Sequence, residues 1–235
     1  MKRSRAFLLT SDELQFIAAA SGMTRILMFQ PAALSDRTQK IQAVFKLIRD
    51  GFFIQKGNSI RIGANLTPFI EIFRQATNVI VARPAGTESP AFCIYGDETA
   101  REFVCISPHE NREDTYKLSI ADTESLMDDL ETMRLLPVIR DDFLTNEIPN
   151  RERQHLFVES ESGGDDGILA AIGEDLVAHF ERYYLQNETC TESITVFRAA
   201  PSWAIIMRRA EEITFSYYRR NDFVRWVEGW QNGEC

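Results

Sequence analysis

The sequence lacks the short motifs that mark the common nucleotide-, metal- and nucleophile-dependent enzymes. The phosphate-binding patterns GxxxxGK[ST] and GxGxxG are absent, and so are HExxH and GxSxG. Only three histidines are present, and His109, His155 and His179 are too far apart to suggest a metal site. We therefore expect no catalytic residues, no metal and no cofactor, and the protein is predicted not to be an enzyme.

Long hydrophobic runs are missing as well. No apolar stretch approaches the about 18 residues that cross a bilayer as a helix. The first residues, MKRSRAFLL, have a basic start but too few apolar residues for a secretory signal. The sequence thus predicts a cytoplasmic protein without membrane insertion.

Cysteine is scarce, with 4 residues and no CxxC pair. Cys93 and Cys105 both lie in strand-like runs, where buried and reduced thiols are expected in a cytoplasmic protein. The same two residues could face each other across a hairpin. A disulfide between them is therefore the alternative.

Charge is distributed unevenly along the chain. Residues 1–85 hold 12 basic and 5 acidic side chains, a net charge of +7, whereas the remainder holds 14 basic and 30 acidic, a net charge of −16. A basic segment on an acidic protein is a reason to consider nucleic acid as a partner.

The N-terminal third predicts a compact helix–hairpin–helix unit. Thr10 and Glu13 match a capping box before a first helix that Gly22 ends. A second helix is expected from Ser35 to Gly51, with Ile41, Val44, Phe45 and Ile48 on its buried face. A hairpin around Gly57-Asn58 and a helix capped by Thr67 follow.

The next part of the chain carries a similar pattern twice. VIVARPA, AFCIY and EFVCI (79–106) are matched by ITVFRAA, WAIIM and TFSYY (194–218), and each set leads to an amphipathic helix. Asp122 is expected to cap the first of these helices and Asn221 the second. A weak internal repeat of this kind predicts two related halves.

A polar, charged stretch separates the halves. We predict a first half at residues 1–136, a linker at 137–165 and a second half at 166–235, together forming one integrated domain. The second half should open with a long helix, whose stripe is Ile168, Ile172, Leu176, Phe180 and Tyr183. The expected fold class is α+β, with a quasi-two-fold repeat and a central, mostly antiparallel sheet on which helical bundles pack.

One interpretation of the basic third is a winged-helix DNA-binding unit. The string LIRDGFFIQKGNSIRI (47–62) has the form of a recognition helix followed by a wing. The alternative is a helix–hairpin unit that uses the same elements for packing. Under the DNA-binding interpretation, a transcriptional regulator would contact DNA through Gln39, Lys40, Gln42, Lys46, Arg49, Lys56 and Arg61.

The order of elements also resembles the EspG family, cytosolic chaperones of type VII secretion. The resemblance is carried by LTSDELQFIAAASGM (9–23), by AVFKLIRDGFFIQKGNSIRI (43–62) and by the repeated strand–hairpin–helix halves. It implies a quasi-two-fold fold that binds the aggregation-prone end of a helical secretion substrate and keeps it export-competent. This chain is shorter than is usual for that family.

A chaperone of this kind needs apolar contacts surrounded by polar groups. Two regions are candidate contact sites for a protein partner. One is the loop at 84–90, with Pro84, Thr87 and Pro90, for which a plain connector is the alternative. The other is the last helix, with Trp226 and Trp230, for which core packing is the alternative.

Overall fold

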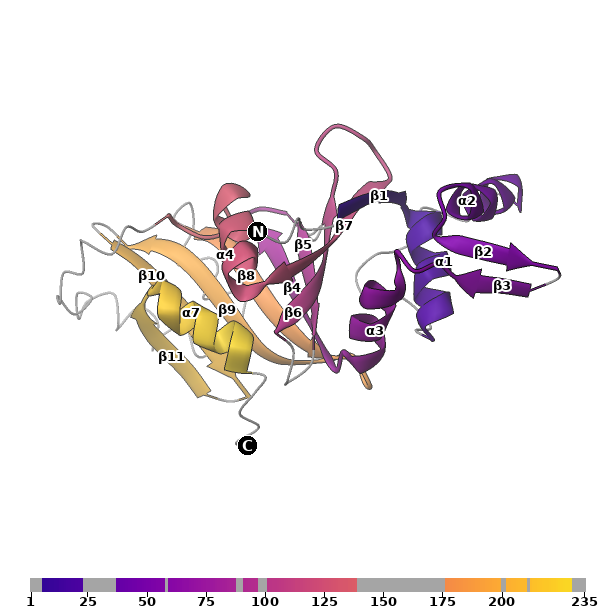
Figure 1. Cartoon of the computed structure of the whole chain (residues 1–235). Coiled ribbons are helices and arrows are strands. Elements are labelled where there is room, and N and C mark those ends of the chain that lie inside the picture. The colour runs from indigo at the N-terminus through magenta and orange to yellow at the C-terminus, as the bar shows by residue number, and fades with distance from the viewer. Residues whose placement is uncertain are drawn as a thin grey trace.

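The structure, a computed structural model, describes residues 6–22, 37–57, 59–87, 91–96, 101–138, 176–199, 202–210 and 212–229. In these ranges the chain forms a nine-stranded antiparallel sheet, a separate two-stranded hairpin and five helices (Figure 1). The predicted α+β class and antiparallel sheet are therefore confirmed.

The large sheet consists of two antiparallel meanders that meet side by side at its centre. The first contains β4 (Asn78–Pro84), β5 (Phe92–Gly96), β6 (Glu102–Pro108) and β7 (Thr115–Asp122). The second contains β8 (Leu176–Tyr184), β9 (Thr189–Ala199), β10 (Ser202–Arg209) and β11 (Glu212–Tyr217). Strand β1 (Ala6–Thr10) pairs with β7, so that β1 and β11 are the two edges.

The meanders are joined by antiparallel pairing between β4 and β8, which we call the seam. Its register runs from Asn78 opposite Tyr184 to Pro84 opposite Ala178. Val79, Ile80, Val81 and Ala82 are all completely buried. The strand is therefore covered on both faces, as expected for an uninterrupted apolar run with no polar alternation.

Helices cover both faces of the sheet and enclose two cores. The first core lies against α1 (Ser11–Ser21) and α3 (Thr67–Gln75), where the rings of Phe73 and Tyr95 are 5.2 Å apart. The second lies against α4 (Thr123–Thr132) and α7 (Arg220–Glu228), where the rings of Phe180 and Phe223 are 4.9 Å apart. Both ring pairs meet edge to face, the arrangement that the aromatic quadrupole favours.

The N-terminal module, which comprises α1, α2, β2, β3 and α3, begins with the predicted capping box. The backbone N–H of Thr10 donates to the Glu13 carboxylate at 2.8 Å, and the N–H of Glu13 donates to Thr10 Oγ1 at 3.3 Å. Gly22 ends α1 with a φ of 86°, a left-handed value that glycine adopts without strain. Glu13 is almost fully buried, and Lys46 of α2 (Arg37–Arg49) meets its carboxylate at 2.7 Å.

The predicted hairpin follows α2. Strands β2 (Phe53–Lys56) and β3 (Ser59–Ile62) pair antiparallel, and Gly57 takes a φ of 61° at the turn. Figure 1 shows α2 and this hairpin at one end of the molecule, far from α7 at the other. The N-terminal module thus extends the molecule beyond the large sheet.

The predicted long helix at the start of the second half is wrong over the part that the structure describes. Leu176–Tyr184 is strand β8, in which Ala178, Phe180 and Arg182 are buried. Leu176, Phe180 and Tyr183 have helical spacing, but pairing with β4 and β9 on its two sides makes this segment a central strand. The earlier part of that helix, with Ile168 and Ile172, lies outside the described residues.

Two predicted caps are also corrected. Helix α3 begins one residue earlier than expected, with Leu66 at the N-cap, and the hydroxyl of Thr67 donates to the carbonyl of Gly63 at 3.4 Å. Helix α7 begins at Arg220, so that Asn221 lies inside it. The Asp122 cap is confirmed, since its carboxylate accepts from the N–H of Ser125 at 2.9 Å. Ser35 lies outside the described residues.

The proposed domain division and the quasi-two-fold repeat stay predictions. Both meanders belong to one sheet, and most of the predicted linker lies outside the described residues. Within the described part of the chain, no helix has the length and apolar character needed to cross a membrane.

Replacing Glu13 with alanine is expected to loosen the N-terminal module. The change removes the acceptor for the Thr10 N–H and the partner of Lys46, so the free energy of unfolding should fall by about 1–3 kcal/mol. Urea denaturation followed by circular dichroism measures the change. Glu71→Ala, at an exposed position of α3, is the matched control and should stay within about 0.5 kcal/mol of wild type; equal effects of the two would contradict this role of Glu13.

Candidate functional site

A polar cluster crosses the seam on the face of the sheet that carries the first core. Arg83 of β4 forms an ion pair with Glu181 of β8, whose carboxylate also accepts from the hydroxyl of Tyr183 at 2.9 Å. His179 Nε2 lies 3.7 Å from Glu181, and its Nδ1 is 2.9 Å from the hydroxyl of Thr195. These groups satisfy one another, so the cluster is best understood as a link between the meanders.

No metal centre can be built from the part of the chain that the structure describes. In those ranges, no group of three or more His, Cys, Asp or Glu side chains converges in a way that could hold an ion. The expectation that the protein is not an enzyme rests on the missing sequence motifs, and it stays a prediction.

A buried carboxylate holds α7 on the sheet. Glu192 of β9 accepts from Trp226 Nε1 at 2.9 Å, pairs with Arg182 Nη1 at 3.0 Å and accepts from Arg209 Nε at 2.5 Å. The Arg182 guanidinium also lies over the Trp226 ring, 4.6 Å from its centroid, and donates to the Trp226 carbonyl. Burial lowers the pKa of Arg182 to about 10, which leaves it charged at neutral pH, and Glu192 opposes that shift.

In this arrangement Trp226 is a core residue. The side chain is 5% exposed and belongs to the second core, so that core packing, the alternative to partner contact, describes its place. Trp230 lies outside the described residues. Within α7, Phe223, Trp226 and Val227 are all buried in the second core.

The predicted contact loop begins where β4 ends. Thr87 is exposed, and its hydroxyl donates to the carbonyl of Pro84 at 3.0 Å. This closes a tight turn over Ala85 and Gly86, whose φ of 71° suits glycine. Pro90 lies outside the described residues. Partner contact through Pro84 and Thr87 stays a prediction.

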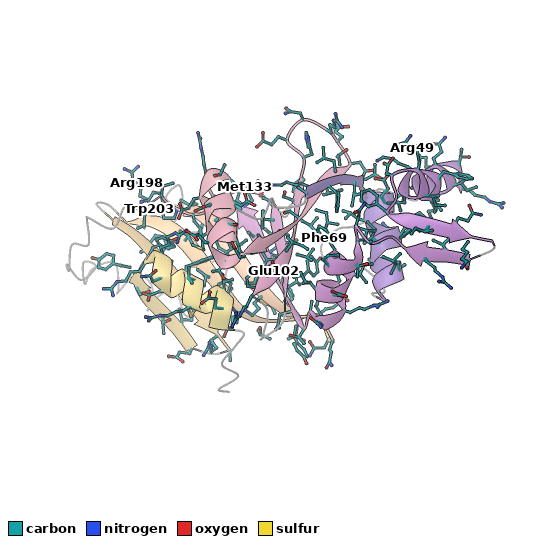
Figure 2. The ribbon with its side chains drawn as sticks, viewed as in Figure 1. Arg49, Phe69, Glu102, Met133, Arg198 and Trp203 are labelled. Atoms are coloured by element: carbon teal, nitrogen blue, oxygen red, sulfur yellow. The ribbon has the colours of Figure 1, made fainter. Side chains whose placement is uncertain are left out.

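The seven residues predicted to contact DNA differ in exposure and pairing. Six of the seven have exposed side chains, and Figure 2 shows Arg49 on α2, at the opposite end of the molecule from Arg198 and Trp203. Lys46 differs, because its ammonium is tied to buried Glu13. Arg49 pairs with Asp50 at 2.9 Å. The six exposed residues are Gln39, Lys40, Gln42, Arg49, Lys56 and Arg61.

Exposed apolar residues were the feature that sequence reasoning missed. The expected buried face of α2 is wrong, because Ala43 and Leu47 are its buried residues while Ile41 is 46% exposed and Phe45 is 64% exposed. On the hairpin, Ile54 and Ile60 are also about half exposed, at 53% and 52%. The one available signal was an apolar arc on α2 too wide for a single buried stripe.

The two strand cysteines are reduced and lie on opposite faces of the sheet. Cys93 is opposite Ile106 and Cys105 is opposite Ile94, so alternation sends Cys93 into the first core and Cys105 into the second. The alternative of a disulfide between them is therefore wrong. Burial raises the pKa of Cys93 to about 12 and raises that of Cys105 as well, whereas Cys190 is exposed.

Replacing Glu192 with alanine should destabilise the protein strongly. The change leaves the buried guanidinium of Arg182 and the indole N–H of Trp226 without this acceptor, and the expected loss is about 3–5 kcal/mol in the free energy of unfolding. Urea denaturation provides the measurement. Glu212→Ala, at an exposed position of β11, is the control and should change the free energy of unfolding by no more than about 0.5 kcal/mol. A loss below about 1 kcal/mol for Glu192→Ala would refute the anchoring role.

Thiol reactivity should follow burial. In a Cys235→Ser background, the native protein at pH 8 should react rapidly with Ellman's reagent at Cys190 alone, because Cys93 and Cys105 are buried thiols with raised pKa values. Adding Cys190→Ser should remove the fast phase, and guanidinium chloride should then release two thiols. Fast reaction of the Cys190→Ser variant in the native state would contradict this assignment.

Comparison with known proteins finds a likeness among solved structures. Neither a known protein family nor a curated protein sequence matches this chain. Among solved structures, the chain is similar to the Mycobacterium tuberculosis type VII secretion system chaperone EspG5, which was determined in complex with a PE25–PPE41 dimer. The identity is 9%, the match covers 96% of this chain and 95% of that chain, and the TM-score is 0.53. At this identity, the likeness shows a shared overall fold, which agrees at that level with the resemblance seen in the sequence.

Proposed function

We propose that this protein is a non-enzymatic, cytoplasmic chaperone or adaptor. It binds a helical secretion substrate and keeps that substrate soluble and export-competent. The observation that carries the proposal is the likeness of fold to EspG5 over 96% of the chain. That chaperone was solved with a protein dimer bound, so protein binding is the activity that the fold is associated with.

The composition and the fold suit such a role physically. A carrier of an aggregation-prone helix must itself stay soluble, and a net charge of −9 favours solubility. A nine-stranded sheet with helices on both faces is a stable scaffold, from which loops and outer helices can contact a partner. The quasi-two-fold relation of the halves is part of this proposal, because it would extend the likeness to the plan of the fold.

DNA binding is the second candidate, and it rests on the exposed cations of α2 and the hairpin. Two observations weigh against it. Lys46, one of the predicted DNA contacts, is paired with Glu13. Ile41 and Phe45 are exposed beside the remaining cations, and apolar side chains of this size gain little from a phosphate backbone.

Co-expression provides the test of the chaperone proposal. Helical secreted proteins encoded by neighbouring genes should be insoluble or degraded when they are expressed alone. With this protein, at least one of them should become soluble and should co-elute with it in gel filtration as a complex of defined mass. An unrelated helical protein of similar length is the control and should not co-elute.

If every neighbouring helical protein is soluble alone, or if none co-elutes, the proposal is wrong. A mobility shift of the upstream DNA at moderate salt, lost in a Lys40→Ala/Arg49→Ala variant, would instead establish the DNA-binding candidate.

A further inference from the structure

Exposed apolar side chains gather in one part of the molecule. Six large apolar side chains are exposed in the described residues, and four of them lie within residues 41–60. Single exposed apolar residues are normal, but a concentration of them marks an interaction surface. The four are Ile41, Phe45, Ile54 and Ile60.

On α2, two of these residues form a line between two arginines. Arg37, Ile41, Phe45 and Arg49 are spaced four residues apart, so each side chain is a neighbour of the next on the helix surface. All four are exposed, and the buried residues Ala43 and Leu47 lie on another side of the helix. We call this line the α2 stripe.

Both arginines of the stripe have exposed side chains. Among the described residues, Arg49 is paired with the neighbouring Asp50, and an ion pair of this kind near the surface contributes little in water. It can therefore be exchanged for a carboxylate of a bound protein. Lys46, by contrast, is engaged with Glu13 and is left out of the surface.

The hairpin extends the same chemistry. Ile54 is opposite Arg61 and therefore shares a face with it, while Ile60 is opposite Gln55 on the other face. Each face of the hairpin thus exposes an isoleucine. From α2 through β3, residues 37–62 hold six basic side chains and a single acidic one. Five of the six remain for the surface once Lys46, which pairs with Glu13, is left out. The surface is both apolar and strongly basic.

We propose that the α2 stripe, with the adjoining hairpin, is a docking surface for an acidic amphipathic helix of a protein partner. Apolar side chains of that helix cover Ile41 and Phe45, and its carboxylates pair with Arg37 and Arg49. The charge of the surface defines the partner, because a helix with carboxylates beside its apolar stripe is complementary in both respects. The inference rests on the proposed function and names a contact surface for it.

Nucleic acid fits this surface less well. A phosphate backbone would pair with Arg37 and Arg49 but would leave the exposed ring of Phe45 without an apolar contact. A second copy of the chain is the other alternative occupant, since the remainder of the sequence is acidic. Both are outcomes of the test.

The test uses two synthetic helical peptides of about 20 residues, long enough to form helix. Both carry the same leucine stripe at positions i, i+3, i+4 and i+7; one has glutamate and the other lysine at the flanking positions. Binding to the full chain is measured by fluorescence anisotropy. The glutamate peptide should bind at least tenfold more tightly than the lysine peptide, and less tightly as salt rises.

Variants locate the binding on the α2 stripe. Phe45→Ser and Ile41→Ser should each lower the affinity for the glutamate peptide about tenfold, as expected for a central apolar contact. Val138→Ser is the matched control, because Val138 is 70% exposed but lies outside residues 37–62, and it should leave binding unchanged. Since Phe45 and Ile41 are exposed, these variants should keep the wild-type circular dichroism spectrum.

Several results would overturn the proposal. The proposal is wrong if the glutamate peptide does not bind or if both peptides bind equally well. It is also wrong if Val138→Ser lowers the affinity as much as Phe45→Ser does. A random-sequence DNA duplex that displaces the peptide and binds more tightly would assign the surface to nucleic acid. A dimer in light scattering that Phe45→Ser converts to monomer would assign it to a second copy.

The same variants separate this inference from the proposed function. If a co-expressed substrate forms a complex that Phe45→Ser leaves unchanged, the chaperone role stands and this docking surface is wrong. If no substrate forms a complex but the glutamate peptide binds through the α2 stripe, the surface stands and the proposed function is wrong.

Discussion

The seam between β4 and β8 is the constraint on which the rest of the structure depends. It turns two four-stranded meanders into parts of one sheet, and it places Val79–Ala82 at the centre with both faces apolar. A strand of this kind is stable only if each face is covered, so the chain must provide helices on both sides. The N-terminal module meets that need on one face, and α4 with α7 meets it on the other.

Much of this architecture can be predicted from the sequence, and the elements that were predicted wrongly have a common cause. The first meander, the capping box of α1 and the hairpin turn depend on neighbouring residues, so local patterns predict them. Local patterns do not predict strand β8. Its buried residues are Ala178, Phe180 and Arg182, and the arginine breaks the alternation of apolar and polar residues that is typical of a strand. Arg182 is buried there only because Glu192 and Trp226, both distant in the sequence, satisfy it. Partners of this kind cannot be read from local periodicity.

The candidate site shows the same limit. Trp226 carries the features of a contact residue in the sequence, but a hydrogen bond to a buried carboxylate makes it part of the core. For Ile41 and Phe45 the reverse holds: their spacing suits a buried face, yet α2 meets the rest of the module through Ala43 and Leu47. A wide apolar arc indicates that part of a helix surface stays exposed. Which part is buried depends on how the helix packs in the folded protein.

The hairpin β2–β3 has a consequence for motion within the native state. Two strands by themselves are marginal in water, and most side chains of this pair are exposed on both faces. Its opening costs few buried contacts and leaves the large sheet intact, so its amides should exchange with solvent much faster than those of β4. A partner that covers this hairpin would slow that exchange locally. The molecule is therefore expected to exchange slowly at its centre and rapidly at this tip.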